Sequence, residues 1–294
     1  MNYSSDFRNT KLYVVGTVRN VERTLRTELL RVYNLFSRHF AVIETFLVES
    51  DSNDKTLHIL ETLSSELEGF KYVSLGNLEQ GIYNRIERLS LCRNRYVQYL
   101  RDETIDTNSL VLVLDLDIRN TRLDTDGVMA ALDAINSWDA VFANQTGRYF
   151  DIYALRHKTW NSVDCFEYES YLKTNGLRNS RKRAIWSKMI NIPKNNQEIN
   201  VQSAFGGMGL YRLDCFLKSD YTPRTELESQ FSEHVVLHNK LIERGARLCI
   251  LPSFVNFGWN PHNLSSILIF RKLDKWTKSP IFHLFRRAMR RRLG

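Results

Sequence analysis

A run of aliphatic residues that ends in two closely spaced carboxylates restricts the fold of this chain more than any other feature. Residues 111–120 read VLVLDLDIRN, so Asp115 and Asp117 follow the run with one residue between them. A continuous apolar run rich in Val and Leu is typical of a buried parallel strand whose two faces are both covered. Because residues i and i+2 of a strand project to the same side, we expect both carboxylates to point at one position beyond the strand.

Strands and helices are predicted to alternate through residues 11–117. Apolar runs at Leu12–Val15, from about Ile43 and in FKYVSLG are each followed by a stretch with helical periodicity. This alternation predicts an α/β fold whose mostly parallel sheet is built from right-handed β-α-β units. Beyond residue 120 the pattern is less regular. DAVFANQ, FDIYALR and ARLCILPSF are predicted strands, SEHVVLHNKLIERG is a predicted helix, and residues 156–200 are predicted to be loop or helix.

The length and charge of the chain indicate one domain followed by a basic segment. At 294 residues the chain can bury a substantial core, and we predict a domain at residues 1–262 and a C-terminal segment at residues 263–294. Residues 271–294 contain nine Lys or Arg and one Asp, which matches the formal net charge of +8 of the whole chain. The body is therefore neutral and offers no broad basic groove, so nucleic acid is not an expected partner.

The C-terminal sequence IFHLFRRAMRRRLG places apolar residues at helical spacing, with arginines largely away from them. Such a segment is typical of a helix that lies on an anionic membrane surface, and the alternatives are a solvated terminus or a helix packed on the body. The N-terminus lacks a signal-peptide core, and no apolar segment has the length of a membrane span. The four widely spaced cysteines fit buried, reduced thiols. We therefore expect a cytoplasmic protein, peripherally attached to the cytoplasmic face of the membrane.

Asp115 and Asp117 have the chemistry of a divalent-metal site. Two hard oxygen ligands suit Mg²⁺ or Mn²⁺, which keeps positions for substrate phosphates and offsets the charge on a leaving diphosphate. The alternative is that both are ordinary turn or helix-cap residues at a strand end.

The loops after the first two predicted strands should reach the same sheet edge as Asp115 and Asp117. The residues there that could contact a nucleoside and its phosphates are Thr17, Arg19, Glu49, Ser50 and Asp51. For the turn-forming string VESDSNDKT, the alternative is a helix cap in which Asp51, Ser52 or Asn53 satisfies free amides.

Several strings of residues carry a family resemblance. VVGTVRN at 14–20, VESDSNDKT at 48–56 and VLVLDLD at 111–117, in this order and spacing, resemble GT-A glycosyltransferases. This resemblance implies a Rossmann-like sheet that binds a nucleotide-sugar through a divalent metal. A narrower resemblance, over roughly residues 11–262, is to the fungal capsule-associated α-1,3-mannosyltransferase family and its bacterial relatives. The strings that carry it are ESDSNDKT at 49–56, LCRNRYVQYL at 91–100, DAVFANQ at 139–145, YFDIYALR at 149–156 and AFGGMGLYR at 204–212.

The resemblance also implies roles for individual residues. Asp115 and Asp117 would hold the metal and the donor diphosphate, with Arg93 and Asn94 near the nucleotide. GT-A enzymes often add a late metal ligand, for which His262 is the candidate, although a lone His is commonly structural. Neutral imidazole suits Mn²⁺ better than Mg²⁺, so this assignment and the metal preference go together.

Two carboxylates are candidates for the catalytic step. Glu233 begins the predicted helix in the position where the resemblance implies an acidic general base, and the alternative is a carboxylate that caps the first helical turn. Asp151 interrupts an apolar pattern and is a candidate for binding donor or acceptor hydroxyls. Gly206 and Gly207 are expected to let the backbone approach a sugar closely. The amides that could bind sugar hydroxyls at a strand end are Asn144 and Gln145.

The leading hypothesis is a metal-dependent glycosyltransferase. It would move a hexose, with mannose favoured by the narrower resemblance, from a nucleotide-diphosphate-sugar to a glycan or lipid-linked acceptor in surface polysaccharide synthesis. One alternative is a phosphohydrolase with Asp115 as nucleophile, because the strand followed by DLDIRN resembles the haloacid dehalogenase motif. The other alternative is a non-catalytic GT-A-like scaffold that binds membranes.

Overall fold

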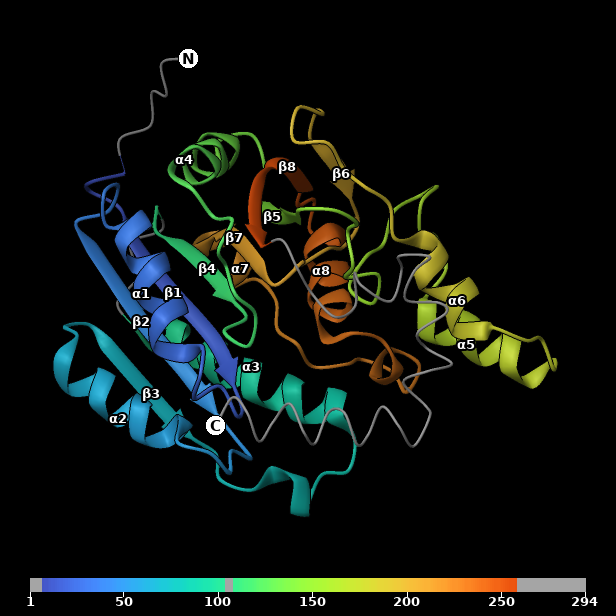
Figure 1. The fold of residues 1–294 in the computed structure, drawn as a ribbon, viewed down its shortest axis with the longest axis horizontal. Helices are drawn as coiled ribbons and strands as arrows, with labels where there is room; N and C mark the ends of the chain where they lie inside the picture. Colours follow the sequence, from blue (N-terminus) through green and yellow to red (C-terminus); the bar gives the residue numbers. More distant parts are fainter. Residues whose placement is uncertain (1–6, 104–107, 258–294) are drawn as a thin grey trace, which may run out of the picture. The chain divides into compact units, whose positions relative to one another are not determined.

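Eight strands form one sheet, and their order determines which side chains meet at its edges. The computed structural model describes residues 7–103 and 108–257, and Figure 1 labels its helices and strands. The strands lie in the order β3-β2-β1-β4-β7-β5-β8-β6. They are β1 (Lys11–Val18), β2 (Val42–Glu49), β3 (Phe70–Ser74), β4 (Leu110–Leu114), β5 (Ala140–Gln145), β6 (Ile199–Val201), β7 (Met208–Arg212) and β8 (Leu248–Phe257).

Most strands of the sheet run in one direction. β1 pairs in parallel with β2 and with β4, and β2 pairs in parallel with β3. β7 lies antiparallel between β4 and β5, so β5 and its parallel partner β8 run in the direction of β4. β6 is antiparallel to β8 at the far edge. The predicted mostly parallel α/β sheet is confirmed, and the carboxyl ends of β1, β2, β4 and β5 lie at one edge together with the amino end of β7.

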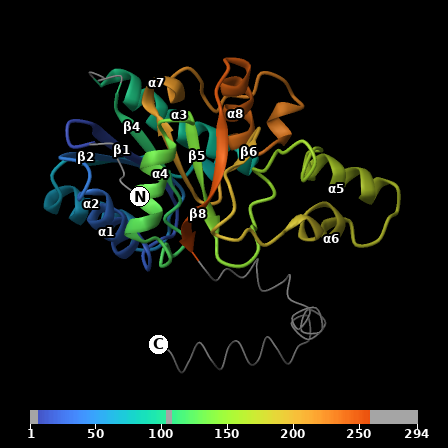
Figure 2. The same ribbon diagram turned by 90° about the horizontal axis from the view of Figure 1, so that it is seen from above.

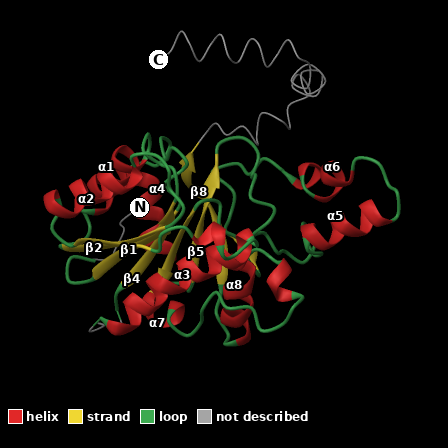
Figure 3. Ribbon diagram, turned by 90° about the horizontal axis from the view of Figure 1, so that it is seen from below, coloured by secondary structure: helices red, strands yellow, loops and turns green. Residues whose placement is uncertain are grey.

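Helices cover both faces of this sheet, as Figures 2 and 3 show. One face packs against α1, α2 and α4, and the other face packs against α3 and α8. The helices are α1 (Leu25–Phe36), α2 (Thr56–Glu66), α3 (Arg85–Asp102), α4 (Thr125–Ala134), α5 (Cys165–Thr174), α6 (Ser180–Ala184), α7 (Leu213–Phe216) and α8 (Glu233–Glu243). Short 3₁₀ turns are η1 (Leu78–Gln80), η2 (Trp186–Lys188) and η3 (Glu228–Gln230).

Successive residues of β4 alternate between the two layers of the core. Leu112 and Leu114 pack with the helices α1, α2 and α4, whereas Val111 and Val113 pack with α3 and α8. All five residues of β4 are buried, which explains why no polar residue interrupts this run. The same alternation directs the next odd-numbered residue, Asp115, toward the layer of α3 and α8.

The predicted strand FDIYALR is wrong. The segment after β5 forms turns, with isolated bridges at Arg156 and His157. Ile152 and Leu155 are buried, and the amide of buried Asn161 donates to the carbonyl oxygens of both, at 3.2 and 2.7 Å. The apolar pattern comes from core packing of an irregular segment, because a side chain rather than a neighbouring strand satisfies its backbone.

Some of the predicted features lie outside the residues that the structure describes, and others lie within them. His262 and the basic segment at residues 263–294 lie outside the described residues. Within residues 7–103 and 108–257, no helix is long and apolar enough to cross a bilayer. Cys92, Cys165, Cys215 and Cys249 are buried free thiols, as predicted.

Gly16 of β1 packs tightly against the end of β4. A Cβ at this position would lie 2.4 Å from the carbonyl oxygen of Leu114, and backbone cannot move aside cheaply. Gly16→Ala should therefore lower the free energy of unfolding by about 1–3 kcal/mol, measured by chemical denaturation. Gly81→Ala is the matched control, because no atom lies within 4 Å of a Cβ built there. Unchanged stability of Gly16→Ala would contradict this close approach.

Candidate active site

Asp115 and Asp117 extend from β4 at the carboxyl edge of the sheet. The backbone N–H of Asp115 donates to the carbonyl oxygen of Gly207 at 2.9 Å, which continues the contact between β4 and β7 for one more residue. The side chain of Asp115 is 31% exposed. Asp117 is exposed, and among the residues that the structure describes its carboxylate has no hydrogen-bond or salt-bridge partner. The two carboxylates are therefore available to a ligand at this edge.

A buried arginine joins Asp115 to the helices beneath the sheet. Arg93, from α3, donates through Nε to Glu233 Oε1 at 3.0 Å, and its Nη2 lies 3.5 Å from Asp115 Oδ1. Its Nη1 donates to the hydroxyl of Tyr96 at 3.2 Å. Arg93 thus links α3, β4 and the first residue of α8. Because all three of its nitrogens already contact protein groups, it supports the carboxylates rather than facing a nucleotide directly.

Negative charge is concentrated around Asp115. The pKa of Asp115 is raised from 3.8 to about 7, first by burial and next by repulsion from Asp117, with smaller contributions from Asp151 and Glu233. Arg93 opposes this rise in pKa. Burial also raises the pKa of Asp151. The cluster therefore holds more negative charge than Arg93 offsets, and a bound cation would relieve the repulsion.

The residues present fit a divalent cation held by two carboxylates. In the described part of the chain, no three His, Cys, Asp or Glu side chains come together as a metal-binding group. Mg²⁺ and comparable ions are commonly bound by one or two carboxylates and complete their coordination with water and substrate phosphates. Asp115 and Asp117 supply such a partial site, and the expected third ligand, His262, lies outside the described residues.

The loop before β7 supports Asp115 and Asp151. The backbone N–H of Gly206 donates to Asp151 Oδ2 at 2.9 Å, and a second Asp151 oxygen accepts from the N–H of Ala154 at 3.3 Å. Gly206 and Gly207 have φ values of +68° and +84°, which other residues rarely adopt. Cβ atoms at these positions would lie 2.4 Å from Gln145 Nε2 and from Ile118 Cδ1, respectively. The close approach to the backbone of Gly206 and Gly207, which was expected of a sugar, is made here by the side chains of Gln145 and Ile118.

The amides at the end of β5 are part of this support. Asn144 Nδ2 donates to the carbonyl oxygens of Ile192 and Pro252, each at 3.0 Å. Gln145 Nε2 donates to the carbonyl oxygen of Gly206 at 3.1 Å, and both side chains are buried. They hold backbone in place, and sugar binding by them stays a prediction.

Sequence reasoning missed a third amide in this group. Asn256, in β8, donates to the carbonyl oxygen of Gly206 at 2.8 Å and is fully buried. A polar residue within the apolar run FVNF was the available signal, because buried amides are retained where they satisfy other polar groups.

The loops after β1 and β2 meet at the same sheet edge. Glu49 accepts from the backbone N–H of Ser52 at 2.9 Å and from the hydroxyl of Ser74. Asp51 has a φ of 61° and accepts from the N–H of Glu79 at 2.7 Å, while Arg19 forms an ion pair with Glu79 at 2.5 Å. Thr17, in β1, is half-buried, and Ser50, which directly follows β2, is buried. The structure brings these predicted residues to one edge, and it adds the unpredicted Glu79.

The alternative role for VESDSNDKT, a cap of the following helix by Asp51, Ser52 or Asn53, is wrong for α2, whose N-cap is Lys55. Ser52 Oγ accepts from the N–H of Asn20 at 3.1 Å, and Thr56 Oγ1 accepts from the N–H of Val21 at 2.8 Å. Asn20 Oδ1 in turn accepts from the N–H of Asn53 at 2.8 Å. These bonds join the loop after β2 to the loop after β1 rather than capping α2 with Asp51, Ser52 or Asn53.

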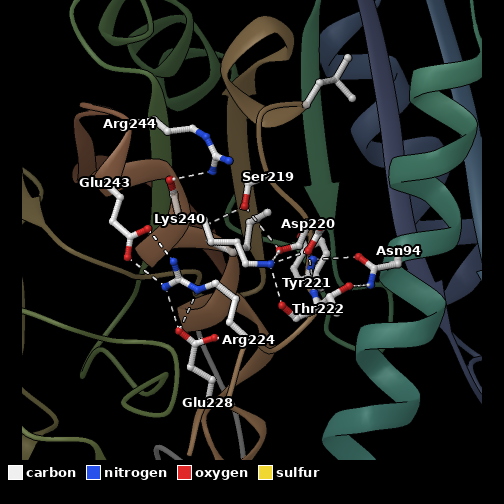
Figure 4. A network of polar contacts seen from close by, with 12 residues as sticks. Asn94, Ser219, Asp220, Tyr221, Thr222, Arg224, Glu228, Lys240, Glu243 and Arg244 are labelled. Atoms are coloured by element: carbon white, nitrogen blue, oxygen red, sulfur yellow. Dashed lines mark hydrogen bonds and ion pairs between the residues drawn. The ribbon is translucent and has the colours of Figure 1, made fainter. Parts of the chain in front are cut away.

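Asn94 belongs to a different network, shown in Figure 4. Its side chain donates to Thr222 Oγ1 at 2.9 Å and accepts from the N–H of Tyr221 at 2.8 Å. Lys240 Nζ, from α8, donates to Asp220 Oδ1 at 2.5 Å and to the carbonyl oxygen of Thr222 at 2.6 Å. These contacts fix the segment that leads into α8 against α3. Asn94 therefore helps to position the start of α8, and the structure does not place it beside Asp115.

Glu233 is buried at the start of α8. Its carboxylate contacts Arg93, as described above, and lies 3.8 Å from the ring of His234. The ion pair with Arg93 holds the carboxylate near the Asp115 cluster, and the hydroxyl of Ser232 lies 3.5 Å from its Oε2. Its role as a general base stays a prediction.

Two histidines of α8, His234 and His238, are buried. His234 stacks on Phe205 with ring centroids 3.7 Å apart, and His238 contacts Ser203 Oγ at 2.8 Å and the hydroxyl of Tyr211 at 2.9 Å. Burial, with a smaller effect of Arg93, lowers the pKa of His238 from 6.5 to about 3. Both rings are therefore neutral packing groups in the folded protein at neutral pH.

The lowered pKa of His238 predicts a pH dependence of stability. The unfolded chain takes up this proton below about pH 6.5, whereas the folded protein takes it up only near pH 3, so the stabilisation is complete above pH 6.5 and is lost progressively on acidification. Between pH 6.5 and 4, His238→Gln should reduce the slope of unfolding free energy against pH by up to about 1.4 kcal/mol per unit. Urea titrations measure the slope. The exposed His58 provides the control His58→Gln, and equal slopes for wild type and His238→Gln would contradict the assignment.

Comparisons with known proteins identify similar solved structures but no family. No protein-family model and no curated protein matches this sequence. Similar structures include mannosyltransferase PcManGT from Pyrobaculum calidifontis in complex with GDP-Man and Mn²⁺, with 13% identity, a TM-score of 0.49, and coverage of 84% of this chain and 56% of that one. S. aureus TarS 1-349 in complex with UDP has 17% identity, a TM-score of 0.46, and coverage of 87% and 62%.

A further similar structure is glucosyl-3-phosphoglycerate synthase from Mycobacterium tuberculosis in complex with UDP. It has 14% identity, a TM-score of 0.42, and coverage of 87% of this chain and 72% of that one. The chain spans less than two thirds of PcManGT and of TarS 1-349. Identities of 13–17% at these TM-scores do not assign the chain to a family.

Proposed function

We propose that this protein is a metal-dependent glycosyltransferase that uses a nucleotide-diphosphate-sugar. The observation that carries the proposal is the position of Asp115 and Asp117 at the carboxyl end of β4. The chain leaves β1 toward β2 and leaves β4 toward the opposite side of the sheet, where β5 lies. Ligands of open α/β sheets bind at such a switch point, beyond the carboxyl ends of the strands. A pair of carboxylates at this point, one half-buried and one exposed, suits a cation-bound diphosphate.

The proposed chemistry assigns distinct tasks to the residues of the cluster. A divalent cation held by Asp115 and Asp117 would supply positive charge to the leaving diphosphate. Glu233 would accept the proton of the acceptor hydroxyl, and its pairing with Arg93 keeps it oriented. Asp151, fixed by two backbone N–H groups, would accept a hydrogen bond from a hydroxyl of the sugar donor or of the acceptor substrate.

The donor nucleotide is proposed to bind along the loops that follow β1 and β2. The exposed and half-buried polar groups of these loops lie at the same sheet edge as Asp115. Hydrogen bonds between the two loops, such as that from the N–H of Asn53 to Asn20 Oδ1, order them before a ligand binds. Preordered groups lose less entropy on binding. The sequence resemblance supports a hexosyl donor, with mannose as the first sugar to test, and a glycan or lipid-linked acceptor in surface polysaccharide synthesis.

Removal of one carboxylate tests the proposed metal site. In Asp117→Asn, the stabilisation that GDP or UDP with Mn²⁺ gives the wild type should be lost in thermal-shift measurements. Release of nucleoside diphosphate from a panel of nucleotide-sugars should fall by about 10²–10³-fold, because charge stabilisation of the leaving group is lost. Asp133→Asn, at an exposed position at the far end of α4, is the matched control and should behave as the wild type.

Other outcomes of this experiment support different functions. Normal turnover by Asp117→Asn would remove the metal hypothesis. Hydrolysis of simple aryl phosphates that depends on Asp115, without nucleotide binding, would favour the phosphohydrolase. Failure of the wild type to bind any nucleoside diphosphate with Mn²⁺ would favour the non-catalytic scaffold.

We also propose that residues 271–294 attach the protein to the cytoplasmic face of the membrane. Their nine basic residues and interspersed Phe, Ile and Met supply the two contributions that surface-bound segments use, charge attraction and apolar insertion. Removing residues 271–294 should weaken co-sedimentation with vesicles that contain phosphatidylglycerol while leaving nucleotide binding intact. Undiminished vesicle binding would refute this assignment.

A further inference from the structure

A helical arm projects from the sheet between β5 and β6. Residues 165–188, here called the basic arm, comprise α5, the turn after it, α6 and η2, and Figures 1 and 3 show α5 and α6 at one extremity, away from the strands. Both ends of the segment that carries the arm are held at the end of β5. The N–H of Tyr149 donates to the carbonyl oxygen of Ile190 at 2.7 Å, and Asn144 donates to Ile192. The arm is therefore anchored at the sheet edge that carries the candidate site.

From Tyr171 onward, the arm and the segment after it carry charge of one sign only. Between Ser170 and Gln197 the sequence contains seven Lys or Arg and no Asp or Glu. Some of these cations are already engaged: Lys173 pairs with Glu169 at 2.9 Å, and Arg181 donates to the hydroxyl of Tyr153 at 3.0 Å. The exposed cations of the arm whose side chains have no hydrogen-bond or ion-pair partner among the described residues are Arg178, Lys182 and Arg183.

The tip of the arm has an ordered backbone and an exposed apolar side chain. The N–H of Leu177 donates to the carbonyl oxygen of Leu172 at 2.9 Å, and the N–H of Gly176 donates to that of Lys173 at 3.0 Å. This is the Schellman pattern, and Gly176 supplies the required positive φ of +67°. Leu177 is nevertheless 42% exposed, and Tyr171, in the last turn of α5, is 60% exposed. The turn thus holds apolar groups in solvent beside Arg178.

We infer that the basic arm contacts an anionic lipid surface. A projecting tip with unpaired cations beside an exposed Leu and Tyr suits a broad surface, where cations meet head groups and apolar side chains enter the interface. A soluble anionic polymer would bind through the cations alone, and its binding would not need an exposed Leu177. This contact is additional to the one proposed for residues 271–294 and does not depend on the proposed catalytic function.

The anchoring of the arm gives the contact a consequence for the site. The arm leaves the sheet at the carboxyl end of β5, and the chain rejoins the sheet at β6, whose amino end lies at the same edge. A surface that binds the tip of the arm would therefore lie on the side from which the loops of the carboxyl edge extend. A lipid-linked acceptor would then be presented near Asp115 and Asp117 without leaving the interface.

Charge reversal on the full-length chain tests the inference. Arg178→Glu/Lys182→Glu/Arg183→Glu should lower the partition coefficient onto vesicles of phosphatidylglycerol and phosphatidylcholine by at least about tenfold, measured by co-sedimentation. The matched control is Arg95→Glu/Lys218→Glu/Arg247→Glu, which changes the net charge equally at exposed cations outside the arm. Both variants keep residues 271–294, so any contribution of that segment is the same in the two.

A second variant separates apolar insertion from charge attraction. Leu177→Ser should reduce vesicle binding about threefold or more without changing binding to soluble polyphosphate, because it removes only apolar contact. Equal vesicle binding by the arm variant and the control variant would overturn the inference. Polyphosphate binding that falls while vesicle binding stays constant would also overturn it and assign the arm to a soluble polyanion. Melting temperatures and GDP or UDP binding should stay unchanged, which separates this result from failure of the proposed function.

Discussion

The buried guanidinium of Arg93 is the interaction on which the arrangement of this site depends. A charged group is expensive to bury unless it is paired, and Arg93 is paired with Glu233 on α8 and lies beside Asp115 on β4. Its position therefore requires α3, α8 and β4 to be packed together before any ligand binds. In the sequence, α8 follows α3 and β4 by more than a hundred residues, so the site exists only in the complete fold.

The second constraint comes from the alternation of side chains in β4. Even-numbered residues pack in one core layer and odd-numbered residues in the other, which directs Asp115 toward Arg93. A shift of one residue would place Asp115 in the opposite layer, away from Arg93. The contacts of Gly16 with Leu114 and of Gly207 with Asp115 maintain this register from the two neighbouring strands. The geometry of the carboxylates thus follows from backbone packing rather than from flexible side chains.

The sequence predicted the sheet and the edge at which its polar residues gather, because those properties follow from local periodicity and strand direction. It also predicted that Glu49, Asp51 and Asp115 would share one edge. It did not predict the Arg93–Glu233 pair, since pairing across 140 positions depends on how two helices pack. Asn144 and Gln145 were recognised as unusual polar residues at a strand end, but only the structure shows that their donors face backbone oxygens. FDIYALR was mistaken for a strand because burial by an irregular segment produces the same apolar pattern.

In the proposed site, Asp115 and Asp117 hold a divalent cation against a diphosphate. Electron paramagnetic resonance of Mn²⁺ tests it directly, because bound Mn²⁺ loses the sharp six-line signal of the free ion. In the presence of GDP or UDP, the wild type should bind one Mn²⁺ per chain, and Asp115→Asn/Asp117→Asn should leave the ion free. Equal Mn²⁺ binding by the two proteins, or none by the wild type, would contradict the account.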